Sequence, residues 1–392
     1  MTALTFTTGH DDEDLREQFT AVATRSYGHP VADIDHLRDH ADLRVAVRDG
    51  RVVAGGLGLL VDQFFGGNPV PSACLAAGCV APEERGDQLA AHMVAERLAP
   101  LREQGAVIST VSTVANGYAR RLGWQAPTPV VAWSVTTDDL RRSFPDHHDL
   151  DIDHGLTAEA RDLQRDLARH HNAPVDRPDW WWDWKTRKST LETYRFTPPG
   201  GTTCGVLTLA TSRRDRHGMT LTVHDFWAAD HDTTHAMLAF LGGHNTRAAT
   251  IDFRRGALPP HPTLVHNLHR CRMTATAWHP WMLRILDTAA ALRRRGWPAD
   301  LDTSTTIEVT ATADHPAQRY HLRLADGRAE VEPTTAPAEV TFTPHQLAVW
   351  YAGGYRTTTA ADIAGVRADK PTALSTVIRA TTAQEPWLPD HF

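Results

Sequence analysis

The first 135 residues alternate between helix-like and strand-like patterns of apolar positions. Leu15, Phe19 and Val22 recur at helical spacing after the acidic residues 11–14, which favour a helix N-terminus. Two apolar segments flank Asp49-Gly50, as is typical of a β-hairpin. The pattern further predicts a strand at Ala73–Val80, a helix from Ala81 through Leu101, a strand at Ala106–Val111, a short helix at Gly117–Gly123 and a strand at Val130–Val135. This order predicts a mixed α/β domain.

A polar, acid-rich stretch near residues 136–155, which includes Asp146, predicts a domain boundary. The middle section again alternates helix and strand, as a second α/β unit would. A third section predicts strands and helices between Ala289 and Thr382, followed by an apolar tail that ends at Phe392. We therefore expect an α/β (α+β) protein with three domains, over residues 1–150, 151–285 and 286–392.

Composition narrows the class of protein. The chain has 392 residues, of which 41% are apolar and 22% charged, and this excludes a largely disordered chain. Its net charge of −7 gives no electrostatic basis for nucleic-acid binding, and its apolar stretches are too short to span a bilayer. The four cysteines form no disulfide framework, and the N-terminus lacks a secretion-signal pattern. We expect a cytoplasmic protein that binds neither nucleic acid nor membrane.

One segment predicts an anion site and carries a family resemblance. After the strand ending at Cys79 and Val80, a helix opens within a few residues, and such a turn presents free backbone N–H groups to an anion. Together with Tyr118–Trp124, this arrangement resembles the GNAT N-acetyltransferases. Two GNAT-like units, a sterol-carrier-like third domain, the W-W-x-W segment and a P-W-x-P-x-x-F terminus resemble the Eis (enhanced intracellular survival) acetyltransferase family over essentially the whole chain.

The resemblance implies a cofactor loop. In that family, the pyrophosphate of acetyl-CoA binds amides of an R/Q-x-x-G-x-G/A loop. Arg85 takes its first position and Ala90 its last, but Gln88 replaces the middle glycine, and a glutamine side chain could block the approach of a phosphate. The cofactor-binding residues that the resemblance implies are Cys79, Val80, Arg85, Gly86, Gln88, Leu89 and Ala90.

Charge at this loop also departs from the family. Glu83, Glu84 and Asp87 outnumber Arg85, and three acids at a helix start could weaken binding of a CoA-like anion about tenfold or more. A plain acid-rich helix N-terminus is the alternative interpretation. Acetyl-CoA is thus a doubtful cofactor on sequence grounds, and we expect no other.

The resemblance implies two catalytic groups, Tyr118 as general acid and the carboxylate of Phe392 as general base. The family tyrosine aligns with Ala119, so Tyr118 stands one residue early and is rotated by about 100° in a helix. A packing role for Tyr118 therefore stays open. The stiff, apolar tail argues against a frayed end and predicts that Phe392 inserts into the central cleft, where burial would raise the basicity of a carboxylate.

Other clusters have weaker chemical meaning. The resemblance places Tyr27 and His29 near the substrate, and we add Trp387 from the tail. His231 and His235 form an i, i+4 pair near His224, but a solvated helix start explains them better than a metal site, and we predict no metal. The run Trp180–Trp184 could stack on a flat ligand, although helical spacing favours a core between domains.

Three functions stay open. The first is an Eis-like enzyme that diverged from acetyl-CoA chemistry to acid–base chemistry on a small molecule, with the Phe392 carboxylate as base. The second is an acetyl-CoA-dependent N-acetyltransferase of an aminoglycoside-like amine. The third is a non-catalytic protein that binds or sequesters a small molecule. The resemblance also implies a homo-oligomer, often a hexamer.

Overall fold

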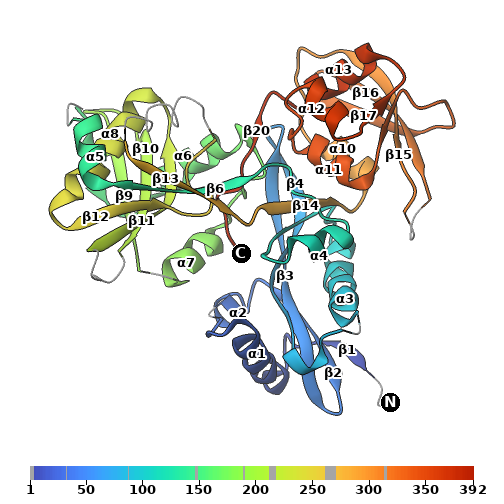
Figure 1. The fold of residues 1–392 in the computed structure, drawn as a ribbon, viewed down its shortest axis with the longest axis horizontal. Helices are drawn as coiled ribbons and strands as arrows, with labels where there is room; N and C mark the ends of the chain where they lie inside the picture. Colours follow the sequence, from blue (N-terminus) through green and yellow to red (C-terminus); the bar gives the residue numbers. More distant parts are fainter. Residues whose placement is uncertain are drawn as a thin grey trace. The chain divides into compact units, whose positions relative to one another are not determined.

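The computed structural model describes residues 4–31, 33–86, 88–145, 149–188, 190–211, 218–260, 271–312 and 316–392. These form two compact units, which are described separately. Unit 1 comprises residues 1–127, residues 281–384 and Phe392, and unit 2 comprises residues 128–280 and 385–391. Mixed sheets covered by helices occupy both units (Figure 1). Among the described residues, no helix is long and apolar enough to cross a membrane.

Unit 1 begins with a six-stranded sheet in the order β1-β2-β3-β4-β5-β14. Its strands are β1 (Thr5–Thr8), β2 (Asp42–Arg48), β3 (Arg51–Phe65), β4 (Asn68–Val80), β5 (Ile108–Ser112) and β14 (Trp281–Ile285). Only β4 and β5 run parallel, because the chain crosses from one to the other through a helix. The helices here are α1 (Glu13–Tyr27), α2 (Asp33–His36), α3 (Leu89–Glu103) and α4 (Asn116–Arg121).

Helices α1 and α3 cover opposite faces of this sheet. A Cβ on Gly55 would meet Phe19 of α1, whereas a Cβ on Gly56 would meet Arg97 of α3. Because neighbouring residues of a strand point to opposite faces, the two helices lie on either side of β3 (Figure 1). The long strands β3 and β4 thus form the buried centre of the sheet.

The sequence placed the start of α3 too early. Residues Pro82–Glu84 form only a 3-10 turn, η1, and the α-helix begins at Leu89. Gly86 and Gln88 have φ values of 122° and 56°, which no α-helix contains. The helix-start pattern at Pro82 therefore produces only the 3-10 turn η1, and the two residues with positive φ separate this turn from α3.

The rest of unit 1 is a smaller α/β region. Its five-stranded sheet has the order β17-β16-β15-β18-β19. The strands are β15 (Thr303–Val309), β16 (Gln318–Ala325), β17 (Arg328–Pro333), β18 (Val340–Phe342) and β19 (Arg367–Ala368). The helices are α10 (Thr288–Arg294), α11 (Pro344–Tyr351), α12 (Thr358–Ile363) and α13 (Pro371–Arg379). Trp350 of α11 is fully buried, and its indole N–H donates to the Val377 carbonyl over 2.8 Å.

Unit 2 is built on a seven-stranded sheet in the order β13-β6-β12-β11-β10-β9-β7. The strands are β6 (Val130–Thr136), β7 (Asp151–His154), β9 (Leu191–Thr197), β10 (Gly205–Thr211), β11 (Met219–Ala228), β12 (Ala248–Phe253) and β13 (Met273–Trp278). Its helices are α5 (Thr137–Ser143), α6 (Ala158–Ala168), α7 (Asp179–Lys188) and α8 (His231–Gly242), followed by the 3-10 turn η2 (Gly243–Thr246). In addition, β8 (His171–Asn172) pairs in parallel with β20 (Glu385–Pro386), which anchors the C-terminal tail to this unit.

The strand predicted at 130–135 does not belong with the first sheet. As β6, it pairs with β12 and β13 and so lies inside the sheet of unit 2. The acid-rich stretch that predicted a boundary contains α5 and β7, whereas Asp146 lies outside the described residues. Strand pairing is decided by distant partners, which the local pattern does not reveal. The three domain ranges inferred from the sequence stay a prediction.

Candidate active site

The loop between β4 and α3 presents backbone amides at the start of a long helix. Gly86 and Gln88 hold left-handed conformations, and Gln88 precedes the first residue of α3 without capping it through its side chain. The first N–H groups of an α-helix have no partner within the helix, so those near Leu89 and Ala90 are available to an anion. Gln88 thus keeps a backbone conformation that suits glycine, and its side chain is exposed.

The acids of this loop are compensated by distant arginines. Arg25 of α1 donates to Glu83 over 3.1 Å, and Arg48 of β2 pairs with Glu84. The backbone amide of Glu83 and Arg25 lower the pKa of the Glu83 carboxyl. Each of the two glutamates therefore pairs with one arginine, while Asp87 lies outside the described residues. These ion pairs offset the negative charges of Glu83 and Glu84, and the expected weakening of CoA binding by the acids stays a prediction.

Strand β4 is bulged just before the loop. Ala76 pairs with Leu57 and Cys79 with Gly55, so Ala77 and Gly78 together oppose one residue of β3. Ala77 has a φ of 48°, and Gly78 is exposed. Pairing with β5 covers only Ser72–Leu75, so the bulged end of β4 has a strand partner on one side alone. Such a bulge redirects peptide groups away from the ladder.

Two of the predicted substrate residues lie beside this bulge. The Tyr27 hydroxyl, at the C-terminal end of α1, donates to the Gly78 carbonyl over 2.9 Å, and 44% of Tyr27 is exposed. His29 is tilted against Tyr27 with 6.2 Å between ring centroids. Burial raises the pKa of the neighbouring Cys79 thiol to about 11 despite a hydrogen bond from Ser26. The structure therefore brings Tyr27 and His29 together with Cys79 and the start of the loop.

Tyr118 and Ala119 occupy different environments on α4. Ala119 is 7% exposed and packs in a core cluster with Leu98, Leu101 and Trp124. Tyr118 is half-buried, and its hydroxyl is buried without a hydrogen-bond partner among the described residues. Burial raises the pKa of Tyr118, and Arg121 beside its ring opposes this rise. A tyrosine at position 119 would point into the core, and the role of Tyr118 as general acid stays a prediction.

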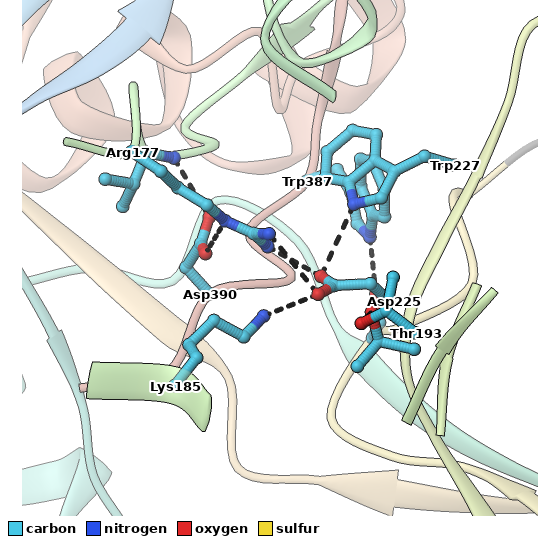
Figure 2. Close-up of polar contacts among 10 residues, drawn as sticks. Arg177, Lys185, Thr193, Asp225, Trp227, Trp387 and Asp390 are labelled. Atoms are coloured by element: carbon cyan, nitrogen blue, oxygen red, sulfur yellow. Dashed lines mark hydrogen bonds and ion pairs between the residues drawn. The ribbon is translucent and has the colours of Figure 1, made fainter. Parts of the chain in front are cut away.

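A buried ion network in unit 2 holds the C-terminal tail (Figure 2). Arg177 donates through Nε to Asp390 over 2.8 Å and through Nη2 to Asp225 over 2.6 Å. The Val175 amide donates to the second oxygen of Asp390, and Lys185 reaches Asp225 over 2.7 Å. The side chains of Arg177, Asp225 and Asp390 are at most 1% exposed. The members of this network are far apart along the chain, so no local sequence pattern indicates it.

The charges of this network stabilise one another. Burial alone would lower the pKa of Arg177, but Asp225 and Asp390 raise it above its ordinary value. Burial likewise opposes ionisation of Asp225, yet Arg177 and Lys185 hold the pKa of its carboxyl well below its usual range. Arg177 and Asp225 thus favour each other's charged form inside the unit, whereas burial lowers the pKa of Lys185.

The tail residues differ in their surroundings. Trp387 is 5% exposed, its indole N–H donates to the Gly256 carbonyl, and its ring contacts His171 and Trp227. These contacts explain how Trp387 anchors the tail, and contact with a substrate stays a prediction for it. Phe392 is 6% exposed and belongs to unit 1, whereas residues 385–391 belong to unit 2. The terminal residue is therefore not a frayed end, and its insertion into a cleft stays a prediction.

The histidine and tryptophan clusters of unit 2 differ in their surroundings. His231 and His235 stack with 4.1 Å between centroids, and no group of three metal-ligating side chains is found among the described residues. Burial lowers the pKa of His224 to about 4. Trp181 and Trp184 of α7 are buried, as the helical spacing indicated, and Arg177 lies over the Trp182 ring at 4.6 Å.

Three parts of the chain match known protein families. Residues 11–126 and 173–285 each match an acetyltransferase (GNAT) domain, and residues 288–389 match a sterol carrier protein domain. The chain is 26% identical over 355 residues to an uncharacterised N-acetyltransferase of Streptomyces avermitilis, covering 83% of this chain and 82% of that protein. It is 35% identical to N-acetyltransferase Eis of Mycobacterium tuberculosis over 106 residues, which are 26% of this chain and 25% of Eis.

Solved structures share the fold over the whole chain. A GCN5-related N-acetyltransferase from Anabaena variabilis superposes with a TM-score of 0.84 at 21% identity, covering 100% of both chains. Eis1 from Mycobacterium abscessus superposes with a TM-score of 0.78 at 19% identity, also over 100% of both. At these identities the likeness shows the fold alone. The predicted fold class, two GNAT-like domains and a sterol-carrier-like domain, is confirmed.

Proposed function

Because this chain is an Eis-like acetyltransferase of the GNAT superfamily with a C-terminal sterol carrier domain, we propose that it transfers the acetyl group of acetyl-CoA to an amine of a small molecule. This is the second of the three functions that the sequence left open. The loop between β4 and α3 is the reason for preferring acetyl transfer over the other two functions. Gln88 keeps the left-handed backbone conformation there, and arginines pair with the acids.

The chain's residues fit acetyl-CoA at this loop. The amides of Arg85, Gly86, Gln88, Leu89 and Ala90 would receive its pyrophosphate at the positive end of α3. A Cβ on Gly86 would meet nothing within 4 Å, so the backbone there is open to a ligand. The preceding strand residues Cys79 and Val80 would line the start of the site. When bound, acetyl-CoA supplies an acetyl thioester, whose C–S bond breaks as the amine forms a C–N bond, one proton leaving the nitrogen and one joining the sulfur.

Tyr118 and Phe392 would handle these two protons. The Tyr118 hydroxyl is protonated at neutral pH, since the ordinary pKa of a tyrosine is about 10 and burial raises it further, so we assign it the role of general acid. The carboxylate of Phe392, which belongs to the same unit, would accept the proton of the amine. The carboxylate assignment comes from the family resemblance, and the burial of Phe392 supports it.

The acceptor and its surroundings are part of the proposal. The net charge of −7 suits a cationic acceptor such as an aminoglycoside-like polyamine. Tyr27 and His29 would contact it beside the bulge of β4, with Trp387 as a further candidate contact from the tail. The proposal also includes a cytoplasmic location and a homo-oligomer such as a hexamer. It includes no binding of nucleic acid.

Calorimetry on the protein with an untagged C-terminus tests it. Acetyl-CoA should bind with micromolar affinity, and CoA thiol should be released when an aminoglycoside or a simple amine is added. Gln88→Gly should bind acetyl-CoA at least as tightly, because it removes only an exposed side chain. Absence of binding at millimolar acetyl-CoA would overturn the proposal and leave acid–base chemistry or sequestration. Release of CoA that survives deletion of Phe392 would remove the terminal carboxylate from the mechanism.

A further inference from the structure

Arg97 of α3 is a buried cation that has no acidic partner within the described part of the chain. It is 5% exposed, and no carboxylate among the described residues forms an ion pair with it. Its Nη2 donates to the carbonyls of Leu57 and Ala76, the latter over 2.6 Å, and its Nε is buried without an acceptor among the described residues. Burial lowers the pKa of Arg97 to about 10, so it remains charged at neutral pH. A buried charge without a counter-ion lowers the stability of the folded protein.

Glycines make room for this guanidinium. A Cβ on Gly56 would lie 2.5 Å from Cζ of Arg97, and a Cβ on Gly78 would lie 2.6 Å from Nη1. We call Gly56 and Gly78 the glycine cradle. A side chain at either position would displace the guanidinium from the centre of the sheet. The backbone is therefore shaped around Arg97 at two neighbouring strands, β3 and β4.

The cradle places Arg97 directly behind the bulge of β4. Leu57 and Ala76, whose carbonyls Arg97 binds, are the last paired residues before the bulge. On its other side, the bulge is fastened by the hydrogen bond from Tyr27 to the Gly78 carbonyl. Gly78 itself is exposed, so one residue separates the buried charge from solvent at the candidate active site.

We propose that Arg97 is a positioning residue that holds the Ala77–Gly78 bulge in place and, through its uncompensated charge, stabilises negative charge on the carbonyl oxygen of an acyl thioester in front of Gly78. The inference rests on the proposed acetyl transfer and adds a residue to it. A preorganised charge behind a polar backbone lowers the energy of developing negative charge without reorganising. Arg97 touches neither cofactor nor substrate and acts through the bulge.

The test separates charge from packing by comparing Arg97→Met with Arg97→Lys in the full chain, since both retain an unbranched side chain and only lysine retains the charge. We expect Arg97→Met to lower kcat about tenfold to a hundredfold, less than the loss of a directly bonded donor, with acetyl-CoA affinity unchanged. Arg97→Lys should stay within about threefold of the wild type. If Arg97→Met does not fold, Arg97→Gln provides the neutral variant.

A second readout needs no acetyl-CoA. Arg97 lowers the pKa of the Cys79 thiol, against the larger effect of burial, so loss of its charge should slow alkylation of Cys79 by iodoacetamide. We expect a decrease of about threefold to tenfold in Arg97→Met, with Cys204 as the internal reference, and no decrease in Arg97→Lys. The rate is measured for each cysteine by mass spectrometry of the alkylated peptides.

Arg295→Met is the matched control. Arg295 is 2% exposed and donates to the carbonyls of Tyr351, Gly296 and Thr381, with no ion pair among the described residues, but it lies in the sterol-carrier-like region. Its loss should leave kcat and Cys79 alkylation unchanged. Equal effects of Arg97→Met and Arg97→Lys, or an unchanged kcat in Arg97→Met, would overturn the inference alone. A wild type that binds no acetyl-CoA would overturn the proposed function, and unchanged alkylation in Arg97→Met would then overturn the charge effect as well.

Discussion

Arg97 of unit 1 and Arg177 of unit 2 are both buried guanidinium groups, and the fold surrounds them in opposite ways. Arg177 pairs with two carboxylates, and Lys185 joins one of them. Arg97 binds two backbone carbonyls and keeps its positive charge uncompensated. In a network of paired charges, the electric fields of the members largely cancel, so little electrostatic potential reaches a ligand. An uncompensated charge lowers the stability of the fold, but its electrostatic potential reaches a neighbouring site.

The difference matches the positions of the two groups. Asp390 belongs to the tail, so the Arg177 network fixes a terminal segment that would otherwise fray. Arg97 instead lies behind the exposed Gly78 at the candidate active site. Buried arginines are thus used for anchoring in unit 2 and, in our proposal, for catalysis in unit 1.

Removing each guanidinium should give the largest contrast. Arg177→Met leaves Asp225 and Asp390 buried with Lys185 as the remaining cation, and we expect it to cost about 3–5 kcal/mol. Arg97→Met removes a charge that has no acidic partner and should change stability by no more than about 1.5 kcal/mol. Denaturant unfolding followed by tryptophan fluorescence measures both. Equal losses would contradict the distinction.

The glycine cradle should be energetically coupled to Arg97. Gly56→Ala places a methyl group 2.5 Å from Cζ of Arg97 and should cost about 1–3 kcal/mol. In the Arg97→Met background, the flexible methionine can move aside and most of this loss should disappear. A double-mutant cycle on the unfolding free energies measures the coupling. Additive losses would show that Gly56 is needed for another reason.

The register of α4 can be tested in the same core. Ala119→Tyr would insert a ring among Leu98, Leu101 and Trp124, so we expect a loss of about 1–3 kcal/mol and no gain of acetyl transfer. Tyr118→Phe should leave stability nearly unchanged, because its hydroxyl has no partner among the described residues, while lowering turnover. Higher turnover in Ala119→Tyr would return the general acid to position 119.

The smallest effect concerns the pH dependence of stability. Because the folded pKa of Asp225 is depressed, its contribution is fully present above the carboxyl's unfolded pKa of about 4 and is lost as pH falls below it. Unfolding midpoints measured between pH 5 and pH 2 should therefore fall less steeply in Asp225→Asn than in the wild type. A parallel pH dependence in both proteins would remove Asp225 from the linkage.

Local signals predicted much of the fold. Helix α1 has an acidic start and apolar residues on one face, and both can be read along the chain, whereas its end at Gly28 is seen in the structure. The hairpin of β2 and β3 follows from Asp49-Gly50 and its apolar flanks. The start of α3 could not be predicted, because Gln88 adopts a left-handed backbone conformation that is unusual for glutamine.

The candidate site was only partly visible in the sequence. The family resemblance pointed to the loop after β4, to Tyr118 and to Phe392. Gly55-Gly56 within an apolar strand is a signal that could have revealed a close approach to β3, but not which residue approaches. The compensation of Glu83 and Glu84 also required Arg25 and Arg48, which lie on other elements.

By itself, the sequence determined the α/β class, most helices and strands and the family, because periodicity, turn residues and motifs are local properties. The tertiary structure decided that β6 joins the sheet of unit 2 and which buried arginine receives carboxylates. Arg177 and Asp390 are separated by 213 residues, and Arg97 approaches Gly56 and Gly78 across two strands. Such partners are selected by packing over the whole unit, since the free energy of a buried charge depends on groups that only the folded chain brings together.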